Sequence, residues 1–170
     1  ALDSLADDIT FGIAPAAIAF SLFKEVSYPA FMQPIEHLMP YTAFLISVFS
    51  ALRLAKFNID TRQTSSFIGM PTPANALFWG SLVTGEHDFL VSEHFNAIYL
   101  FILVVIMSLL LVAESPMFSL TFKNMSWQSN KVSYIFLIVS IPLIAVFRLS
   151  GFAAVILWYV ILSLVTYKKA

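Results

Sequence analysis

The sequence predicts an all-α protein that crosses a membrane several times, for two reasons of composition and one of pattern. Of its 170 residues, 59% are hydrophobic and 11% are charged, whereas soluble domains are about 45–50% apolar and about 25% charged. The mean hydropathy is +0.86. Several apolar runs approach or exceed the roughly 20 residues that a helix needs to span a bilayer. We therefore expect residues 1–170 to form one transmembrane helix bundle without a soluble domain.

Apolar runs between charged or proline-rich stretches predict six membrane spans in this chain. The predicted spans are residues 5–23, 41–57, a short one from 69–73 to about 83, 97–113, 132–147 and 152–166. In the first span, Pro15 is expected to kink the helix. Gly12 and Ala16 are small residues one turn apart, which lets a neighbouring backbone approach closely.

The second span carries small side chains at Ser47, Ala51 and Ala55. We expect this ridge to pack inside the bundle, because small residues are enriched where membrane helices touch. The third span opens with Pro73 in its first turn, where the missing N–H of proline would have no partner anyway. The connections read as polar loops, with a short interfacial helix in residues 24–40 and a tight turn at 148–151.

The distribution of basic residues predicts the orientation. Six alternating spans place two basic residues, Lys24 and Arg148, on one side and seven on the side of the chain's first residues. These seven are Arg53, Lys56, Arg62, Lys123, Lys131, Lys168 and Lys169. Under the positive-inside rule the side with seven faces the cytoplasm. Residues 53–58 and 69–73 then share that membrane face with the acidic start of the chain.

Two aspartates at the start of the first span are the leading candidates for a functional site. Asp3 and Asp7 are four residues apart, so a helix places both carboxylates on one face. Asp8 lies about 100° further round the helix and is expected to point elsewhere. Spacing alone leaves two interpretations open: a solvated acidic first turn that suits the helix dipole, or oxygen ligands for a divalent cation, one of them also able to act as a base.

The stretch Leu2-Asp3-Ser4-Leu5-Ala6-Asp7, followed by Phe11-Gly12 and Pro15-Ala16, resembles the CDP-alcohol phosphatidyltransferase family. The family motif is D-x2-D-G-x2-A-R-x8-G-x3-D-x3-D, and Asp3 and Asp7 match its last two aspartates. Residues 52–58 and 67–74 resemble the membrane-integrated phosphatidylserine synthase branch. The earlier part of the motif would lie before residue 1. The resemblance therefore implies an N-terminally truncated chain, inactive alone, from a protein with about eight spans.

The resemblance also implies roles for single residues. Asp3 would bind Mg²⁺ or Mn²⁺, and Asp7 would bind the metal and act as the base that deprotonates serine. Arg53, Lys56, Asn58 and Gly69 would bind substrate, although the basic residues also suit plain membrane anchors and Gly69 suits a structural role. The three histidines, His37, His87 and His94, fall on the opposite membrane face.

The function that follows is transfer of a phosphatidyl group from CDP-diacylglycerol to L-serine, with release of CMP, at the bacterial inner membrane. A homodimer is expected by analogy. A different acceptor alcohol or an archaeal lipid donor stays open, and so does a small cation transporter, although the last three predicted spans carry no charges mid-membrane. The net charge of −1 argues against nucleic acid as a partner. The absence of cysteine excludes disulfides and thiolate metal sites.

Overall fold

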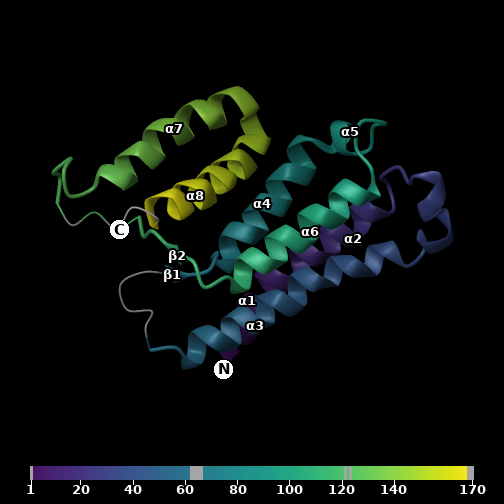
Figure 1. Cartoon of the computed structure of the whole chain (residues 1–170), viewed down its shortest axis with the longest axis horizontal. Helices are drawn as coiled ribbons and strands as arrows, with labels where there is room; N and C mark the ends of the chain where they lie inside the picture. The colour runs from purple at the N-terminus through teal and green to yellow at the C-terminus, as the bar shows by residue number, and fades with distance from the viewer. Residues whose placement is uncertain (1, 62–66, 121, 123, 168–170) are drawn as a thin grey trace.

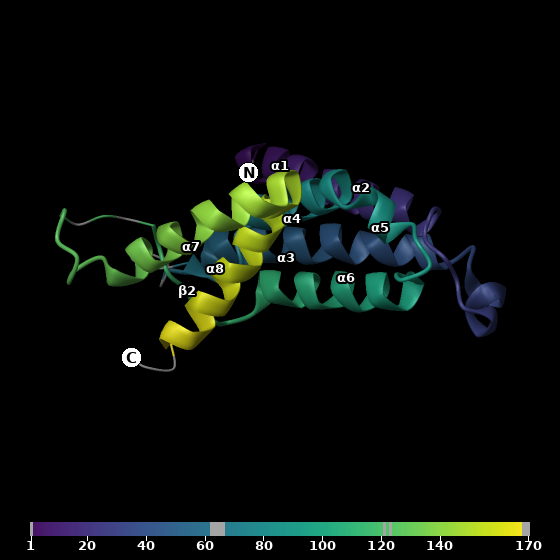
Figure 2. The same cartoon turned by 90° about the horizontal axis from the view of Figure 1, so that it is seen from above.

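A computed structural model describes residues 2–61, 67–120, 122 and 124–167, and its helices pack side by side in an elongated bundle (Figures 1 and 2). Among the residues that support the orientation argument, Arg62, Lys123, Lys168 and Lys169 lie outside the described part of the chain. The predicted all-α fold is confirmed, with one very small sheet in addition. The core is built from large apolar side chains such as Phe23, Phe78 and Trp79.

The first helix runs without a break from Leu2 to Phe23, as α1 (Leu2–Asp8), a π-helical turn η1 (Ile9–Ile13) and α2 (Ala14–Phe23). The π turn is the local response to Pro15, because proline has no N–H and its ring collides with the preceding turn of a regular helix. In the widened turn the Ala14 N–H donates to the carbonyl of Ile9, five residues back. The helix also begins three residues before the predicted start of the span.

Gly12 lies inside this turn and is buried against the next long helix. A Cβ at this position would stand 2.9 Å from the Ser50 Oγ. The predicted close approach at Gly12 is therefore confirmed, and its partner is the helix that carries Ser50.

That second long helix consists of η3 (Met39–Phe44) and α3 (Leu45–Ile59), and it follows the short 3-10 helix η2 (Ala30–Ile35) in the predicted loop. The prediction for its ridge of small residues is wrong, because Ala51 and Ala55 are exposed. Instead α3 buries a larger and partly polar face, which packs against η1 and α6. Its buried residues are Ile46, Ser50, Arg53 and Leu54.

The next two helices agree closely with their predictions. Helix α4 (Thr72–Gly85) starts with Pro73 in its first turn, and a single turn, α5 (His87–Leu90), follows it. Helix α6 (Ala97–Val112) begins at Asn96, whose Oδ1 accepts a hydrogen bond of 2.9 Å from the Ile98 N–H. Such caps satisfy N–H groups that a helix start leaves without partners.

Two stretches predicted as loops meet in a short sheet. Strand β1 (Phe67–Ile68) pairs antiparallel with β2 (Pro116–Met117), and Phe67 is the register partner of Met117. The pairing continues past the strand, because the Gly69 N–H donates to the Ser115 carbonyl at 3.0 Å and the Met70 N–H to the Leu110 carbonyl at 2.9 Å. We call residues 67–70 and 115–117 the strand clasp. It fixes the segment before α4 to the end of α6.

The last two helices, α7 (Lys131–Phe147) and α8 (Gly151–Tyr167), form an antiparallel hairpin (Figure 1). The predicted tight turn is present as η4 (Arg148–Ser150). Gly151 is needed there for space, because a Cβ would stand 2.6 Å from the Ile144 Cα.

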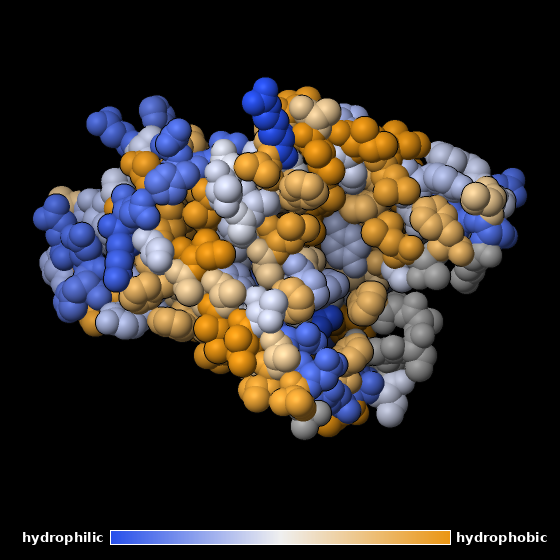
Figure 3. Space-filling model, turned by 180° about the vertical axis from the view of Figure 1, so that it is seen from behind, coloured by the Kyte–Doolittle hydropathy of each residue, from blue (hydrophilic) through white to orange (hydrophobic). Residues whose placement is uncertain are grey.

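Apolar side chains cover much of the molecular surface, and hydrophilic side chains gather toward its edges (Figure 3). Within the described residues, three helical stretches are long and apolar enough to cross a membrane: Leu2–Phe23, Met39–Ile59 and Lys131–Tyr167, the last of which contains the hairpin. Ala97–Val112 is apolar but shorter. These features are those of an integral membrane protein.

Candidate active site

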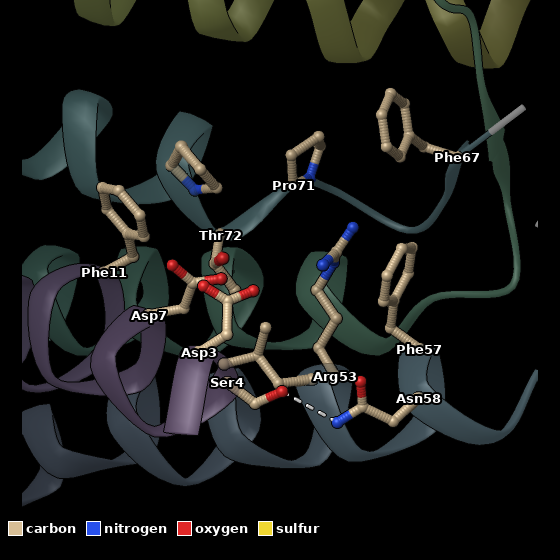
Figure 4. A pocket seen from close by; sticks show the side chains of 12 residues that line it. Asp3, Ser4, Asp7, Phe11, Arg53, Phe57, Asn58, Phe67, Pro71 and Thr72 are labelled. Carbon is tan, nitrogen blue, oxygen red and sulfur yellow. Dashed lines mark hydrogen bonds between the residues drawn. The ribbon is translucent and has the colours of Figure 1, made fainter. Parts of the chain in front are cut away.

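A cavity of about 290 Å³ opens where the start of α1, the second half of α3 and the segment before α4 meet (Figure 4). Its walls contain the two candidate aspartates together with Arg53 and Asn58. The three sequence segments that were expected to share a membrane face therefore meet in space. The cavity also has apolar walls, formed by Phe11, Leu54, Phe57, Phe67 and the prolines 71 and 73.

The carboxylates of Asp3 and Asp7 lie next to each other and both extend into the cavity (Figure 4). Asp3 is exposed and Asp7 is half-buried. Asp8 points away from this pair, as its position round the helix predicts, and its Oδ1 is buried beside Gly12 and Ser50. Asp7 and Asp8 are consecutive in sequence but have different surroundings. Asp3 and Asp7, which are four residues apart, face the cavity.

Arg53 brings a positive charge to the same cavity from the opposite wall. Its side chain leaves α3 and directs the guanidinium toward the open space (Figure 4). The residue is only 8% exposed, and its Nε has no hydrogen-bond partner in the described part of the chain. Because an arginine presents a rigid fork of donors that matches carboxylates and phosphates, a bound anion would satisfy this buried group.

Asn58 joins two walls of the cavity. Its Nδ2 donates a hydrogen bond of 2.9 Å to the Ser4 Oγ, which ties the end of α3 to the first turn of α1. Ser4 lies between the two aspartates in sequence and was not singled out from the sequence, because a lone serine in an apolar helix carries no distinguishing signal. The bond joins the helix that carries the two aspartates to the helix that carries Arg53.

Lys56 and Gly69 lie outside this cavity. Lys56 is exposed and lines a small neighbouring cavity of about 30 Å³, together with Arg53, Asp60 and Glu114. Gly69 is part of the strand clasp and adopts φ +75, a conformation that favours glycine. A Cβ there would stand 2.6 Å from the Leu111 carbonyl oxygen. The backbone at Gly69 therefore lies close against the end of α6.

No family model matches this chain, but curated proteins do. A CDP-diacylglycerol–serine O-phosphatidyltransferase of Bacillus subtilis strain 168 is 38% identical over 42% of the chain. One from Helicobacter pylori strain 26695 is 29% identical over 96% of it. An archaetidylserine synthase of Methanothermobacter thermautotrophicus is 33% identical over 45%.

The chain is thus similar to CDP-diacylglycerol–serine O-phosphatidyltransferases over most of its length. The matched region spans 36% of the Bacillus relative, 65% of the Helicobacter relative and 29% of the archaeal one. This similarity rests on sequence, and the geometry above adds that Asp3 and Asp7 share a cavity with Arg53.

The residues around the cavity fit a divalent cation in part. Within the described ranges, no group of three or more His, Asp or Glu side chains is arranged to hold a metal. Two neighbouring carboxylates still offer the hard oxygen donors that Mg²⁺ and Mn²⁺ prefer, and these ions commonly complete their shell with water and substrate phosphates. The histidines are placed elsewhere: the His87 Nε2 lies 2.8 Å from the Glu25 Oε2, beyond the far end of the first helix.

Proposed function

We propose that this chain carries part of the active site of an enzyme that transfers a phosphatidyl group from CDP-diacylglycerol to the hydroxyl of L-serine and releases CMP. The observation that carries the proposal is the shared cavity of Asp3, Asp7 and the buried Arg53, in a chain similar to phosphatidylserine synthases. The cavity combines a guanidinium group, which can bind an anion, with two carboxylates, which can bind a cation. It also has apolar walls, as a site for an amphipathic donor requires.

In the proposed reaction, Asp7 accepts the proton of the serine hydroxyl while the serine oxygen attacks the phosphorus on the lipid side of the pyrophosphate. The bond between that phosphorus and the CMP oxygen breaks, and CMP leaves with the electron pair. Arg53 binds phosphate oxygens through its guanidinium. Asp3 and Asp7 would hold Mg²⁺ or Mn²⁺. The bound cation would neutralise negative charge on the pyrophosphate.

The small cavity next to the main one favours an amino acid as the acceptor. Its walls carry two basic side chains, Arg53 and Lys56, and two acidic ones, Asp60 and Glu114. A zwitterion presents a carboxylate and an ammonium group, so side chains of both signs suit it, whereas a phosphorylated alcohol presents negative charge alone. A space of about 30 Å³ holds no more than one end of such a molecule, so the rest of the acceptor would lie in the main cavity. Arg53 lines both cavities and can therefore contact the acceptor and the phosphate region.

We further propose that the six predicted spans cross the bacterial inner membrane and that the cavity faces the cytoplasm. The basic residues Arg53 and Lys56 lie at the cavity end of α3, in agreement with the positive-inside rule. Serine and CDP-linked lipids would then reach the site from the side where nucleotides are made. A homodimer is retained as part of the proposal, on analogy alone.

The experiment uses membranes that contain the protein expressed from its own gene, radiolabelled serine, CDP-diacylglycerol and Mn²⁺ or Mg²⁺. We expect labelled phosphatidylserine, and a rate that falls about 10²–10⁴-fold in Asp7→Asn, the range that general bases contribute. Asp88→Asn is the matched control, because Asp88 is exposed on α5, away from the cavity.

Each alternative has its own outcome in this experiment. Incorporation of another alcohol instead of serine would refute the acceptor. Faster reaction with a CDP-linked ether lipid of archaeal type than with CDP-diacylglycerol would refute the donor. An Asp7→Asn variant as active as wild type would refute the proposed base.

A further inference from the structure

Two buried oxygen atoms lie behind the aspartate pair, on two different helices. The Oδ1 of Asp8 and the Oγ of Ser50 are both buried, and neither has a hydrogen-bond partner in the described part of the chain. Ser50 belongs to α3 and is 0% exposed. Asp8 is the last residue of α1 and directly follows Asp7. The proposed reaction uses neither of these two side chains.

Gly12 shows that the two oxygen atoms share one small region. A Cβ on Gly12 would stand 2.4 Å from the Asp8 Oδ1 and 2.9 Å from the Ser50 Oγ. Because glycine has no side chain, Asp8 from the same helix and Ser50 from α3 can both approach the backbone of the π turn η1 there. The region lies inside the interface in which η1 packs against α3.

The chemistry of the two groups makes them suitable partners. A buried carboxylate oxygen or hydroxyl costs free energy unless it is hydrogen-bonded. A carboxylate accepts hydrogen bonds, whereas a serine hydroxyl can donate one. One water molecule that accepts from the Ser50 hydroxyl and donates to the Asp8 carboxylate would satisfy both, as buried waters commonly do.

The same two helices are already joined on the other side of Asp7. The Asn58 Nδ2 donates to the Ser4 Oγ at 2.9 Å, and Ser4 comes shortly before Asp7 in sequence, as Asp8 comes directly after it. On α3, Ser50 and Asn58 lie about two turns apart. A link between Asp8 and Ser50 would therefore hold the first helix against α3 on both sides of Asp7.

We propose that Asp8 and Ser50 hold a water molecule between the first helix and α3, and that this Asp8–Ser50 tie positions Asp7 for proton transfer. The inference rests on the proposed function, in which Asp7 is the base. Asp8 and Ser50 are positioning residues, since neither lines the catalytic cavity. They act through the helix backbone, and a displacement of about 1 Å in a reacting group can cost about 10²-fold in rate.

The test removes each partner alone and both together, in the protein expressed from its own gene. We expect Ser50→Ala and Asp8→Ala each to lower kcat about tenfold to a hundredfold, with an unchanged KM for serine, because the tie acts on the base and not on the bound substrate. The double variant should lose no more than the more impaired single variant, since either change alone breaks the tie. Asp8→Asn should keep most of the activity, because its amide oxygen still accepts a hydrogen bond.

Ser108→Ala is the matched control. Ser108 is 1% exposed on α6, and its Oγ also lacks a hydrogen-bond partner among the described residues. It is not among the atoms nearest to Gly12. We expect wild-type kcat from this variant, so that the loss of a buried serine hydroxyl as such is separated from the loss of the tie.

Metal affinity can be measured without turnover. Electron paramagnetic resonance of free Mn²⁺, titrated with each variant, gives the dissociation constant of the bound ion. Asp7 is also a proposed metal ligand, so its displacement in Ser50→Ala should weaken Mn²⁺ binding by about tenfold or more, as losses behind a metal ligand commonly do. Thermal unfolding in detergent shows which variants are folded, and Ser50→Ala with Asp8→Asn carries the test if Asp8→Ala does not fold.

The outcomes separate this inference from the proposed function. The Asp8–Ser50 tie would be overturned if the effects of the two single variants multiply in the double variant, or if Asp8→Asn is as impaired as Asp8→Ala. Wild-type kcat and Mn²⁺ affinity in Ser50→Ala would also overturn it. Failure of wild type to make phosphatidylserine would overturn the proposed function instead, and the Mn²⁺ titrations would still report on the tie.

Discussion

At the scale of single residues, the burial of Arg53 is the feature that most constrains the site. A guanidinium that is 8% exposed in an apolar bundle is costly unless it has an anionic partner. The described residues leave its Nε without a hydrogen bond. Among the described residues, the guanidinium is therefore available to an anion bound in the cavity.

Replacing this arginine by lysine tests how the charge is used. We expect Arg53→Lys to keep the fold but to lower kcat/KM for serine incorporation by about tenfold to a hundredfold, because an ammonium group cannot bind oxygen pairs as a fork. The control is Arg148→Lys, at an exposed position on the turn between α7 and α8. Equal activity of wild type and Arg53→Lys would show that charge alone suffices.

The sequence predicted the aspartate pair but could not predict its surroundings. The four-residue spacing of Asp3 and Asp7 is a local property of one helix, so their common face followed directly. The burial of Arg53 depends on which side of α3 meets α6 and η1, and the small-residue ridge suggested the wrong side. Which side chains are buried depends on how all the helices pack together, so the sequence of a single helix gives little indication of it.

At the scale of elements, the helices were predictable and the strand clasp was not. The bounds of α4, α6, α7 and α8 follow apolar runs that end at prolines, polar loops or Gly151. The clasp joins Phe67 to Met117 across a long stretch of sequence, and strands of two residues have no periodicity to detect. In the nearby sequence the clasp is indicated by Gly69, because glycine readily adopts the positive φ that the backbone has there.

A substitution in the clasp distinguishes a structural Gly69 from one that binds substrate. We expect Gly69→Ala to destabilise the protein by about 1–3 kcal/mol, because alanine is strained at positive φ and its Cβ meets the Leu111 carbonyl. The measurement is thermal unfolding in detergent. Gly80→Ala is the control: a Cβ there meets nothing within 4 Å, so replacement inside α4 should be neutral or stabilising by up to about 1 kcal/mol. A Gly69→Ala protein with unchanged stability but a raised KM for serine would favour a direct binding role.

At the scale of the whole molecule, the orientation in the membrane can be measured with introduced cysteines. Residues 1–170 contain no cysteine, so a single cysteine can be placed at an exposed position at either end of the bundle. Lys56→Cys should react with a membrane-impermeant maleimide only in inverted vesicles. His94→Cys should react only in right-side-out vesicles. Labelling of both from one side would contradict the proposed arrangement of spans.

Dependence on a divalent cation is a second prediction at the scale of the whole molecule. We expect excess EDTA to abolish serine incorporation and Mg²⁺ or Mn²⁺ to restore it, since the two carboxylates and the pyrophosphate all carry negative charge that a cation must offset. Potassium at equal ionic strength is the control for screening. Full activity in EDTA would contradict the proposed role of Asp3.

The π turn at Ile9–Ile13 has one more consequence for the protein. A single additional residue in a helical turn changes the direction of everything beyond it by about 100°. Without the extra residue, the face that carries Asp3 and Asp7 would be turned by about this angle relative to the face that carries Ala16 and Ala19. A regular helix could then place the carboxylates in the cavity or bury the two alanines, but not both. With the extra residue in the π turn, one continuous helix directs the carboxylates into the cavity and also buries the alanines.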